Sequence, residues 1–107
     1  MSHIELSLAS QDDRRQITDY TVRRFGVTQA RRLRNAFEQA LRRLAESPEL
    51  GTSQPEIDPP GRSFRYFVLL RTFIIVYEPV EDGIRVARLI HGARDLSREL
   101  DDDPGAD

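Results

Sequence analysis

The sequence predicts an α+β fold in which an N-terminal strand and an α-helical hairpin precede a three-stranded antiparallel β-meander (β-α-α-β-β-β). One observation is that apolar side chains recur at helical spacing over residues 28–47. Another is a series of three β-branched and aromatic runs after residue 62, separated by turn signals. The third is the length of 107 residues, which allows one domain with one modest core. We expect this domain to span residues 1–98, and residues 99–107 to form an acidic, disordered tail.

The first strand is predicted where apolar and polar residues alternate at the start of the chain. Ile4, Leu6 and Leu8 fall on one side of this strand. A helix is expected to follow, because Ser10 is a suitable N-cap residue. Two aspartates come soon after it, in the first turn, where the helix dipole favours acidic side chains.

Two helices joined by a short connection are predicted before residue 48. The first is expected to end near Phe25, because Gly26 suits the position just after a helix. Thr28 is expected to cap the second helix, and Pro48 to close it. With so short a connection, the two helices should form an antiparallel hairpin. The apolar residues expected to point inward are Ile17, Tyr20 and Phe25 in the first helix and Ala30, Leu33, Phe37, Ala40, Leu41 and Leu44 in the second.

A surface loop and then three strands are predicted after the hairpin. Residues 49–61 contain three prolines and two glycines, which favour an irregular loop. The strands are expected at about residues 63–70, 73–78 and 84–91, with a tight turn between the first two and an Asp-Gly turn before the third. Residues 94–100 are expected to form a short helical turn.

Both faces of the predicted sheet are apolar. Phe64, Tyr66 and Val68 alternate with Phe67 and Leu69, and the next two strands repeat the pattern. A sheet with one face in water would alternate apolar with polar residues. The hairpin can cover one face, so the other needs the chain's own termini, a second copy or another protein. We expect the face with Phe67 and Leu69 to bind a partner, with the opposite face as the alternative. In the last strand, Val86 and Ile90 are expected on one face, and Ala87 and Leu89 on the other.

The composition is that of a soluble globular protein. All 16 basic residues are arginines, and the absence of cysteine excludes disulfides and cysteine-based metal sites. Five of the 18 acidic residues lie in residues 99–107. The rest of the chain has 13 acidic and 16 basic residues, so its net charge is about +3. We expect no membrane span, no signal peptide and a cytoplasmic location. No glycine-rich phosphate loop is present, and we expect no cofactor.

The last predicted strand ends in a compact polar corner. His91, Arg94 and Asp95 follow a β-branched run and lie on either side of Gly92. Polar groups at the end of a strand are well placed for contact chemistry, because the sheet holds their backbone. A structural role is the alternative for each: a histidine ring bound to a backbone carbonyl, and an Arg94–Asp95 ion pair.

Several short motifs follow one another in a fixed order along residues 6–96. They are Leu6-Ser7 with Asp13 and Ile17, Phe25-Gly26 with Ala30, Leu-Ala-Glu-Ser-Pro-Glu-Leu-Gly at residues 44–51, Arg65, Ile75-Val76-Tyr77, and Leu-Ile-His-Gly-Ala-Arg-Asp-Leu at residues 89–96. Together, in this order and at these spacings, they resemble the ParE branch of the RelE/ParE toxin superfamily. Three positions depart from the family pattern: Leu8 where proline is common, Ser10 where alanine is, and Arg14 where leucine is.

The resemblance implies a toxin of a type II toxin–antitoxin module. Members of the ParE type are reported to poison DNA gyrase, and a cognate ParD-like antitoxin of the ribbon-helix-helix class holds them inactive. It implies no direct sequence-specific DNA binding by the toxin itself. The residues expected to contact the antitoxin or the target are Arg65, Phe67, Leu69, Arg88, His91 and Arg94.

The alternative function is that of the RelE branch, which cleaves mRNA on the ribosome. In-line RNA cleavage needs a base, an acid and stabilisation of the phosphorane charge. In this reading His91 is the base, and Arg65 and Arg88 bind the phosphate. The chain has no lysine, and no tyrosine follows Tyr77. Because one histidine without a second acid or base makes an incomplete nuclease, we expect a toxin that is not an enzyme.

Overall fold

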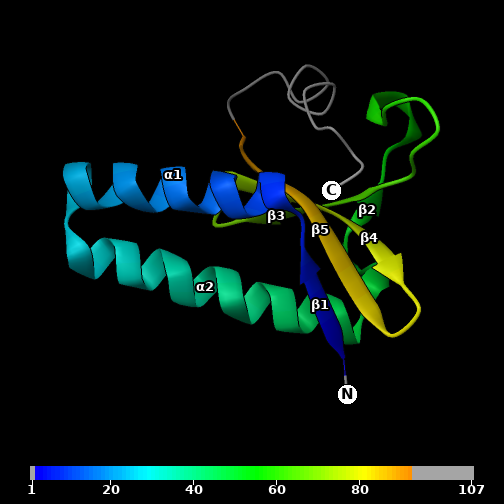
Figure 1. The fold of residues 1–107 in the computed structure, drawn as a ribbon, viewed down its shortest axis with the longest axis horizontal. Coiled ribbons are helices and arrows are strands. Elements are labelled where there is room, and N and C mark those ends of the chain that lie inside the picture. Colours follow the sequence, from blue (N-terminus) through cyan, green and yellow to red (C-terminus); the bar gives the residue numbers. More distant parts are fainter. Residues whose placement is uncertain (1, 93–107) are drawn as a thin grey trace.

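An α-helical hairpin lies against one face of a five-stranded sheet (Figure 1). The computed structural model describes residues 2–92, so the predicted turn at residues 94–100 and the predicted tail lie outside the described residues. The elements are β1 (His3–Leu6), α1 (Leu8–Phe25), α2 (Val27–Glu46), β2 (Thr52–Ser53), β3 (Arg65–Leu69), β4 (Phe73–Val80) and β5 (Gly83–His91), with 3-10 helices at Pro48–Leu50 and Pro55–Ile57.

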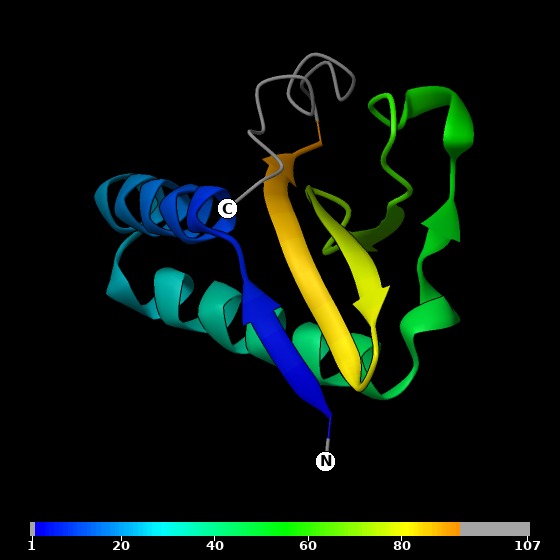
Figure 2. The same cartoon turned by 45° about the vertical axis from the view of Figure 1, so that its right-hand side comes forward.

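The sheet confirms the predicted fold class. Its strand order is β1-β5-β4-β3-β2, with β1 parallel to β5 and antiparallel pairing elsewhere. The three long strands β3, β4 and β5 form the predicted meander, and Figure 2 shows β1 alongside β5. The short strand β2 lies inside the segment predicted as an irregular loop. Two residues are too few to show a period in the sequence, and only their pairing with β3 defines them.

The first helix begins earlier than predicted. Its N-cap is Ser7, whose side chain accepts a hydrogen bond from the Ser10 backbone N–H. Ser10 is therefore not the cap: it is buried in the first turn, and its hydroxyl donates to the Ser7 carbonyl. Leu8, predicted to extend the first strand, is instead the first residue of α1 and is exposed. The Ser7 hydroxyl also donates to the Ala87 carbonyl at 2.7 Å, which ties the start of α1 to β5.

Gly26 alone connects the two helices. Its φ of +92° lies in the region that favours glycine, so it ends α1 and starts α2 in one residue. The predicted cap Thr28 lies inside α2, which has no side-chain cap. Tyr20 and Phe25 were predicted to point inward, and this was wrong: both are exposed. They lie near the joined end of the helices, which extends past the sheet in both views (Figures 1 and 2).

The core under the hairpin follows the predicted face of α2. Phe37, Leu41 and Leu44 are buried there against Ile75 and Tyr77 of the sheet. Leu44 is fully buried, and burying one such side chain contributes about 1.5–3 kcal/mol. This half of the hairpin therefore supplies much of the stability of the fold.

The prediction that both sheet faces are apolar is confirmed, but the faces divide differently in β5. Opposite the helices, a second cluster contains Phe64, Tyr66, Val76, Ala87 and Ile90. Between Val76 and Tyr77 the register of β4 and β5 shifts at a β-bulge, where Ala87 has no partner of its own. An extra residue reverses the alternation of side chains beyond it. Val86 and Leu89 therefore share the helix-facing cluster, although parity predicted opposite faces.

The face expected to bind a partner is the face that the helices cover. Leu69 is buried in the helix-facing cluster, and Phe67 packs against that cluster. Their neighbour Val68 points the other way and is 62% exposed. The hairpin thus covers the face that was expected to stay open for a partner, because the sequence pattern alone does not say which of two apolar faces the hairpin covers.

Hydrogen bonds between Asp58 and the start of β3, which we call the latch, hold the segment before β3 over the sheet face opposite the helices. The Tyr66 hydroxyl donates to Asp58 Oδ1 at 2.5 Å, and the same oxygen accepts from the Phe64 backbone N–H. Burial, with the nearby carboxylate, raises the pKa of Tyr66 well above its ordinary value. Ile57 packs on the second cluster from this segment. The chain thus covers part of its own second apolar face.

Candidate functional site

His91 lies at the end of β5, as predicted. It pairs with Phe73 across the strands, and the two rings meet edge to face with centroids 5.5 Å apart. Both border a shallow depression of about 520 Å³ that Val68, Arg71 and Ile74 also line. The turn beside it is strained, because Leu70 and Arg71 both have positive φ. Arg94, expected in the same corner, lies outside the described residues.

Arg65 is held by backbone oxygens at the opposite end of the sheet. Its Nη1 donates to the Gly51 carbonyl at 2.6 Å and to the Glu49 carbonyl at 3.4 Å. Beside it the Tyr77 hydroxyl donates to the Pro48 carbonyl and accepts from the Gly51 N–H. Burial raises the pKa of Tyr77. A side chain on Gly51 would collide with Tyr77, since a Cβ there would lie 2.5 Å from the hydroxyl oxygen. Arg65 thus helps to join the end of α2 to the sheet.

Arg88 is bound to a carboxylate of α1. Its Nε and Nη2 donate to the two oxygens of Asp13 at 2.7 and 2.9 Å. The Leu89 backbone N–H also donates to Asp13, at 3.0 Å. Only 12% of the Arg88 side chain and 14% of the Asp13 side chain are exposed. A two-pronged pair with so little exposure is strong, and it holds α1 against β5.

The three residues of the nuclease alternative lie apart. His91 lies at the same level of the sheet as Leu69, since both pair with Phe73. Arg65 lies four residues before Leu69 in β3, so the backbones of Arg65 and Leu69 are about 13 Å apart along the strand. Arg88 turns toward α1 and is occupied by Asp13. One phosphate could not contact all three side chains in this arrangement. The geometry therefore separates the residues that this alternative would need together.

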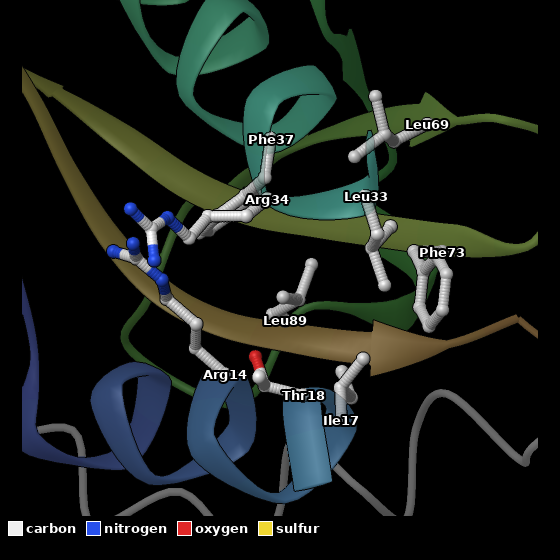
Figure 3. Close-up of a pocket in the computed structure, with 9 residues that line it drawn as sticks. All are labelled: Arg14, Ile17, Thr18, Leu33, Arg34, Phe37, Leu69, Phe73 and Leu89. Carbon is white, nitrogen blue, oxygen red and sulfur yellow. The ribbon is translucent and has the colours of Figure 1, made fainter. Parts of the chain in front are cut away.

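A pocket opens between the hairpin and the sheet. Figure 3 shows apolar side chains forming its floor and two arginines, Arg14 and Arg34, together at one side. Both arginines bind the same carboxylate, Glu38, so one positive charge remains in excess. The cavity volume is about 20 Å³, the space of roughly one water molecule. It therefore has room for no more than the end of one small apolar group. Its lining residues are Arg14, Ile17, Thr18, Leu33, Arg34, Phe37, Leu69, Phe73 and Leu89.

Sequence reasoning missed two parts of this arrangement. Asp13 was expected only to interact favourably with the dipole of the first helix. In the structure it binds Arg88, which lies 75 positions later in the sequence. Arg14 was noted only as a departure from the family pattern, yet it lines the pocket and lies over the Phe37 ring at 5.5 Å. The bulge at Ala87 displaces Arg88, and nothing in a single sequence marks it. Pairing with Asp13 could therefore not be predicted from strand parity.

Comparison with known proteins decides the family. A family model described as the ParE toxin of the type II toxin–antitoxin system parDE matches residues 4–96. The chain belongs to the ParE toxin family. It is 31% identical over 96 residues to Toxin ParE1 of Mycobacterium tuberculosis in two strains, CDC 1551 / Oshkosh and H37Rv, covering 89% of this chain and 94% of that protein. The solved chromosomal ParDE system of P. aeruginosa shares the fold, with a TM-score of 0.68 and 20% identity over 85% of this chain and 96% of that one.

Several motif residues of this ParE-family chain have structural roles. Ser7 caps α1 and binds β5, Asp13 binds Arg88, and Gly26 makes the helix junction. These contacts hold the hairpin in place on the sheet. Within residues 2–92, no helix is long and apolar enough to cross a membrane. The resemblance read from the sequence is confirmed at the level of the family.

Proposed function

We propose that this toxin inhibits DNA gyrase by binding to it in the cytoplasm, without catalysing a reaction. The observation that carries the proposal is the Asp13–Arg88 pair, which occupies the arginine that a nuclease would use on the phosphate. Arg65 is likewise engaged with backbone carbonyls. Since both arginines serve the fold, inhibition by binding fits the arrangement better than RNA cleavage.

We also propose that a ParD-like antitoxin of the ribbon-helix-helix class uses the pocket between the hairpin and the sheet. An apolar floor with excess positive charge at one side fits an amphipathic segment that carries an apolar anchor and acidic residues. Leu33 and Phe73 line the pocket and are only partly buried, so an incoming side chain can reach them. Leu69 contributes to the floor from within the core.

One experiment separates gyrase inhibition from RNA cleavage. Purified toxin is added to gyrase and supercoiled plasmid with ATP, and DNA cleavage complexes are trapped with detergent and counted. In parallel, mRNA from induced cells is examined by primer extension. The proposal predicts cleaved plasmid and no codon-positioned breaks in mRNA. Breaks in mRNA that disappear in His91→Ala, with plasmid left intact, would contradict it.

The antitoxin proposal has its own test. Leu33→Asp places a carboxylate at the pocket mouth beside the partner's acidic residues, and it should weaken antitoxin binding at least tenfold. Leu50→Asp is the matched control, because Leu50 is exposed and outside the pocket. Equal loss of affinity in both variants would show that the pocket is not the contact.

A further inference from the structure

The joined end of the two helices carries most of the apolar surface that the hairpin exposes. We call residues 19–32 the hairpin tip. Nine large apolar side chains are exposed among residues 2–92, and four of them belong to the tip. Their exposed fractions are 51% for Tyr20, 39% for Val22, 63% for Phe25 and 59% for Val27. The tip extends past the sheet in both ribbon views, so no strand covers these side chains (Figures 1 and 2).

The fold does not need large apolar residues at these positions. The side chains buried within the tip are small: Thr21 is 6% exposed and Ala30 is 7% exposed. The Thr21 hydroxyl donates to the Ile17 carbonyl and so needs no other partner. Small residues between the helices allow the two to approach closely. Tyr20 and Phe25 contact each other with ring centroids 6.5 Å apart, and more than half of each residue is exposed.

The tip is also strongly basic. Arg23, Arg24, Arg31 and Arg32 are all exposed, against the single carboxylate of Asp19, so the net charge of the tip is +3. Within residues 2–92 none of these four arginines forms an ion pair with a carboxylate. By contrast, Arg65 and Arg88 are held by partners inside the chain. Exposed aromatic residues beside unpaired arginines are typical of protein-binding surfaces.

We propose that the hairpin tip is the surface by which this toxin binds the protein that it inhibits, through an acidic patch with an apolar centre on that protein. The inference rests on the proposed function. Charge argues against a second copy of the chain, because two tips of +3 would repel each other. A nucleic acid would attract the arginines but would leave Val22 and Val27 without an apolar partner. An acidic, partly apolar protein surface complements both features.

The tip is tested by matched substitutions in the full chain. Phe25→Ser and Val27→Ser remove apolar surface from the tip, and Leu8→Ser removes a 70% exposed side chain from the other end of α1. Arg24→Gln removes a tip charge, and Arg42→Gln removes an exposed charge far along α2. Affinity for purified gyrase, affinity for the antitoxin, growth arrest and melting temperature are measured for each. Affinity for a 20-base-pair DNA duplex is measured as well.

Phe25→Ser and Val27→Ser should each weaken gyrase binding about ten- to a hundredfold, as expected when an apolar anchor is lost from an interface. Antitoxin affinity and melting temperature should stay unchanged, and Leu8→Ser should behave as wild type. Arg24→Gln should weaken gyrase binding severalfold at low salt and less at high salt, whereas Arg42→Gln should not.

Other outcomes would overturn the inference in distinguishable ways. If wild type traps gyrase and the tip variants bind it equally well, the tip is not the contact but the proposed function stands. If the tip variants lose antitoxin affinity, the antitoxin covers the tip. If they lose affinity for the DNA duplex, the tip binds nucleic acid. If wild type neither arrests growth nor binds gyrase, the proposed function and this inference fall together.

Discussion

Large apolar side chains are buried in one half of the hairpin and exposed to solvent in the other half. At the root, residues 33–46, Phe37, Leu41 and Leu44 are buried against the sheet. At the tip, the buried residues are small, and Phe25 and Val27 are exposed. The root thus stabilises the fold, whereas the tip exposes apolar surface that contributes little to folding. The difference shows that apolar residues of one helix pair need not all serve the core, and we assign the exposed set at the tip to binding.

The largest effect on folding is expected beneath the root. Leu69→Asp places a carboxylate in the apolar core under α2, where Leu69 is only 8% exposed. We expect a loss of at least about 3–5 kcal/mol in the free energy of unfolding, as for other uncompensated buried charges. Val68→Asp is the matched control, because Val68 is the next residue and is exposed on the opposite face. Denaturant titration measures both, and equal losses would show that the two faces are misassigned.

A smaller loss is expected where α1 is tied to β5. Asp13→Asn removes the charge from the carboxylate that binds the little-exposed Arg88 guanidinium, which should cost about 2–3 kcal/mol. Asp12→Asn also removes an ion pair with an arginine, but that pair is exposed and should matter by less than about 0.5 kcal/mol. Urea unfolding curves of the two variants test the difference. Similar midpoints would mean that the Asp13–Arg88 pair stabilises the fold no more than an exposed ion pair does.

The latch on the second face should have a modest effect that depends on pH. Tyr66→Phe loses one hydrogen bond to Asp58 and should cost about 1 kcal/mol at neutral pH. Because the folded-state pKa of Tyr66 is raised, the folded protein keeps a proton that the unfolded chain loses above about pH 10. Stability should therefore fall as pH rises past that point, and Tyr66→Phe should reduce the slope. Thermal melts of the wild type and of Tyr66→Phe between pH 8 and 11 measure the two slopes, and equal slopes would contradict this expectation.

The smallest effect on stability is expected at the tip itself. Phe25→Ser removes a 63% exposed ring, so the free energy of unfolding should change by no more than about 0.5 kcal/mol, as is usual for surface substitutions, and the melting temperature should hardly move. Its effect on growth arrest should nevertheless be large. A strongly lowered melting temperature would instead show that Phe25 is part of the core, and the contrast between root and tip would fail.

Much of the fold followed from the sequence because its signals are local. Helical spacing in α2, Gly26 and the three strand runs predicted the hairpin and the meander. The misplaced cap at Ser10 shows the limit, since Ser7 and Ser10 are equally good cap residues and only the end of β1 selects between them. The exposed Tyr20 and Phe25 were assigned to the core because periodicity cannot show that a helix extends past its sheet.

The site was less predictable because it depends on long-range placement. The sequence correctly indicated an apolar sheet on both sides, yet the covered face and the bulge at Ala87 are set by tertiary packing. Arg65 and Arg88 were candidates for phosphate or partner contacts because arginines on strands suit both. Their actual partners, the Gly51 carbonyl and Asp13, come from distant parts of the chain. The family resemblance, by contrast, rested on short motifs whose order the sequence displays directly.

Hydrogen–deuterium exchange of the full chain, alone and with purified gyrase, tests the contrast between root and tip most directly. Amides of residues 36–46 lie in the packed half of the hairpin and should already exchange slowly in the free toxin. Adding gyrase should slow exchange in peptides that cover residues 19–32 and leave the root unchanged. Slower exchange confined to the sheet, or no change at the tip while gyrase is demonstrably bound, would contradict the account.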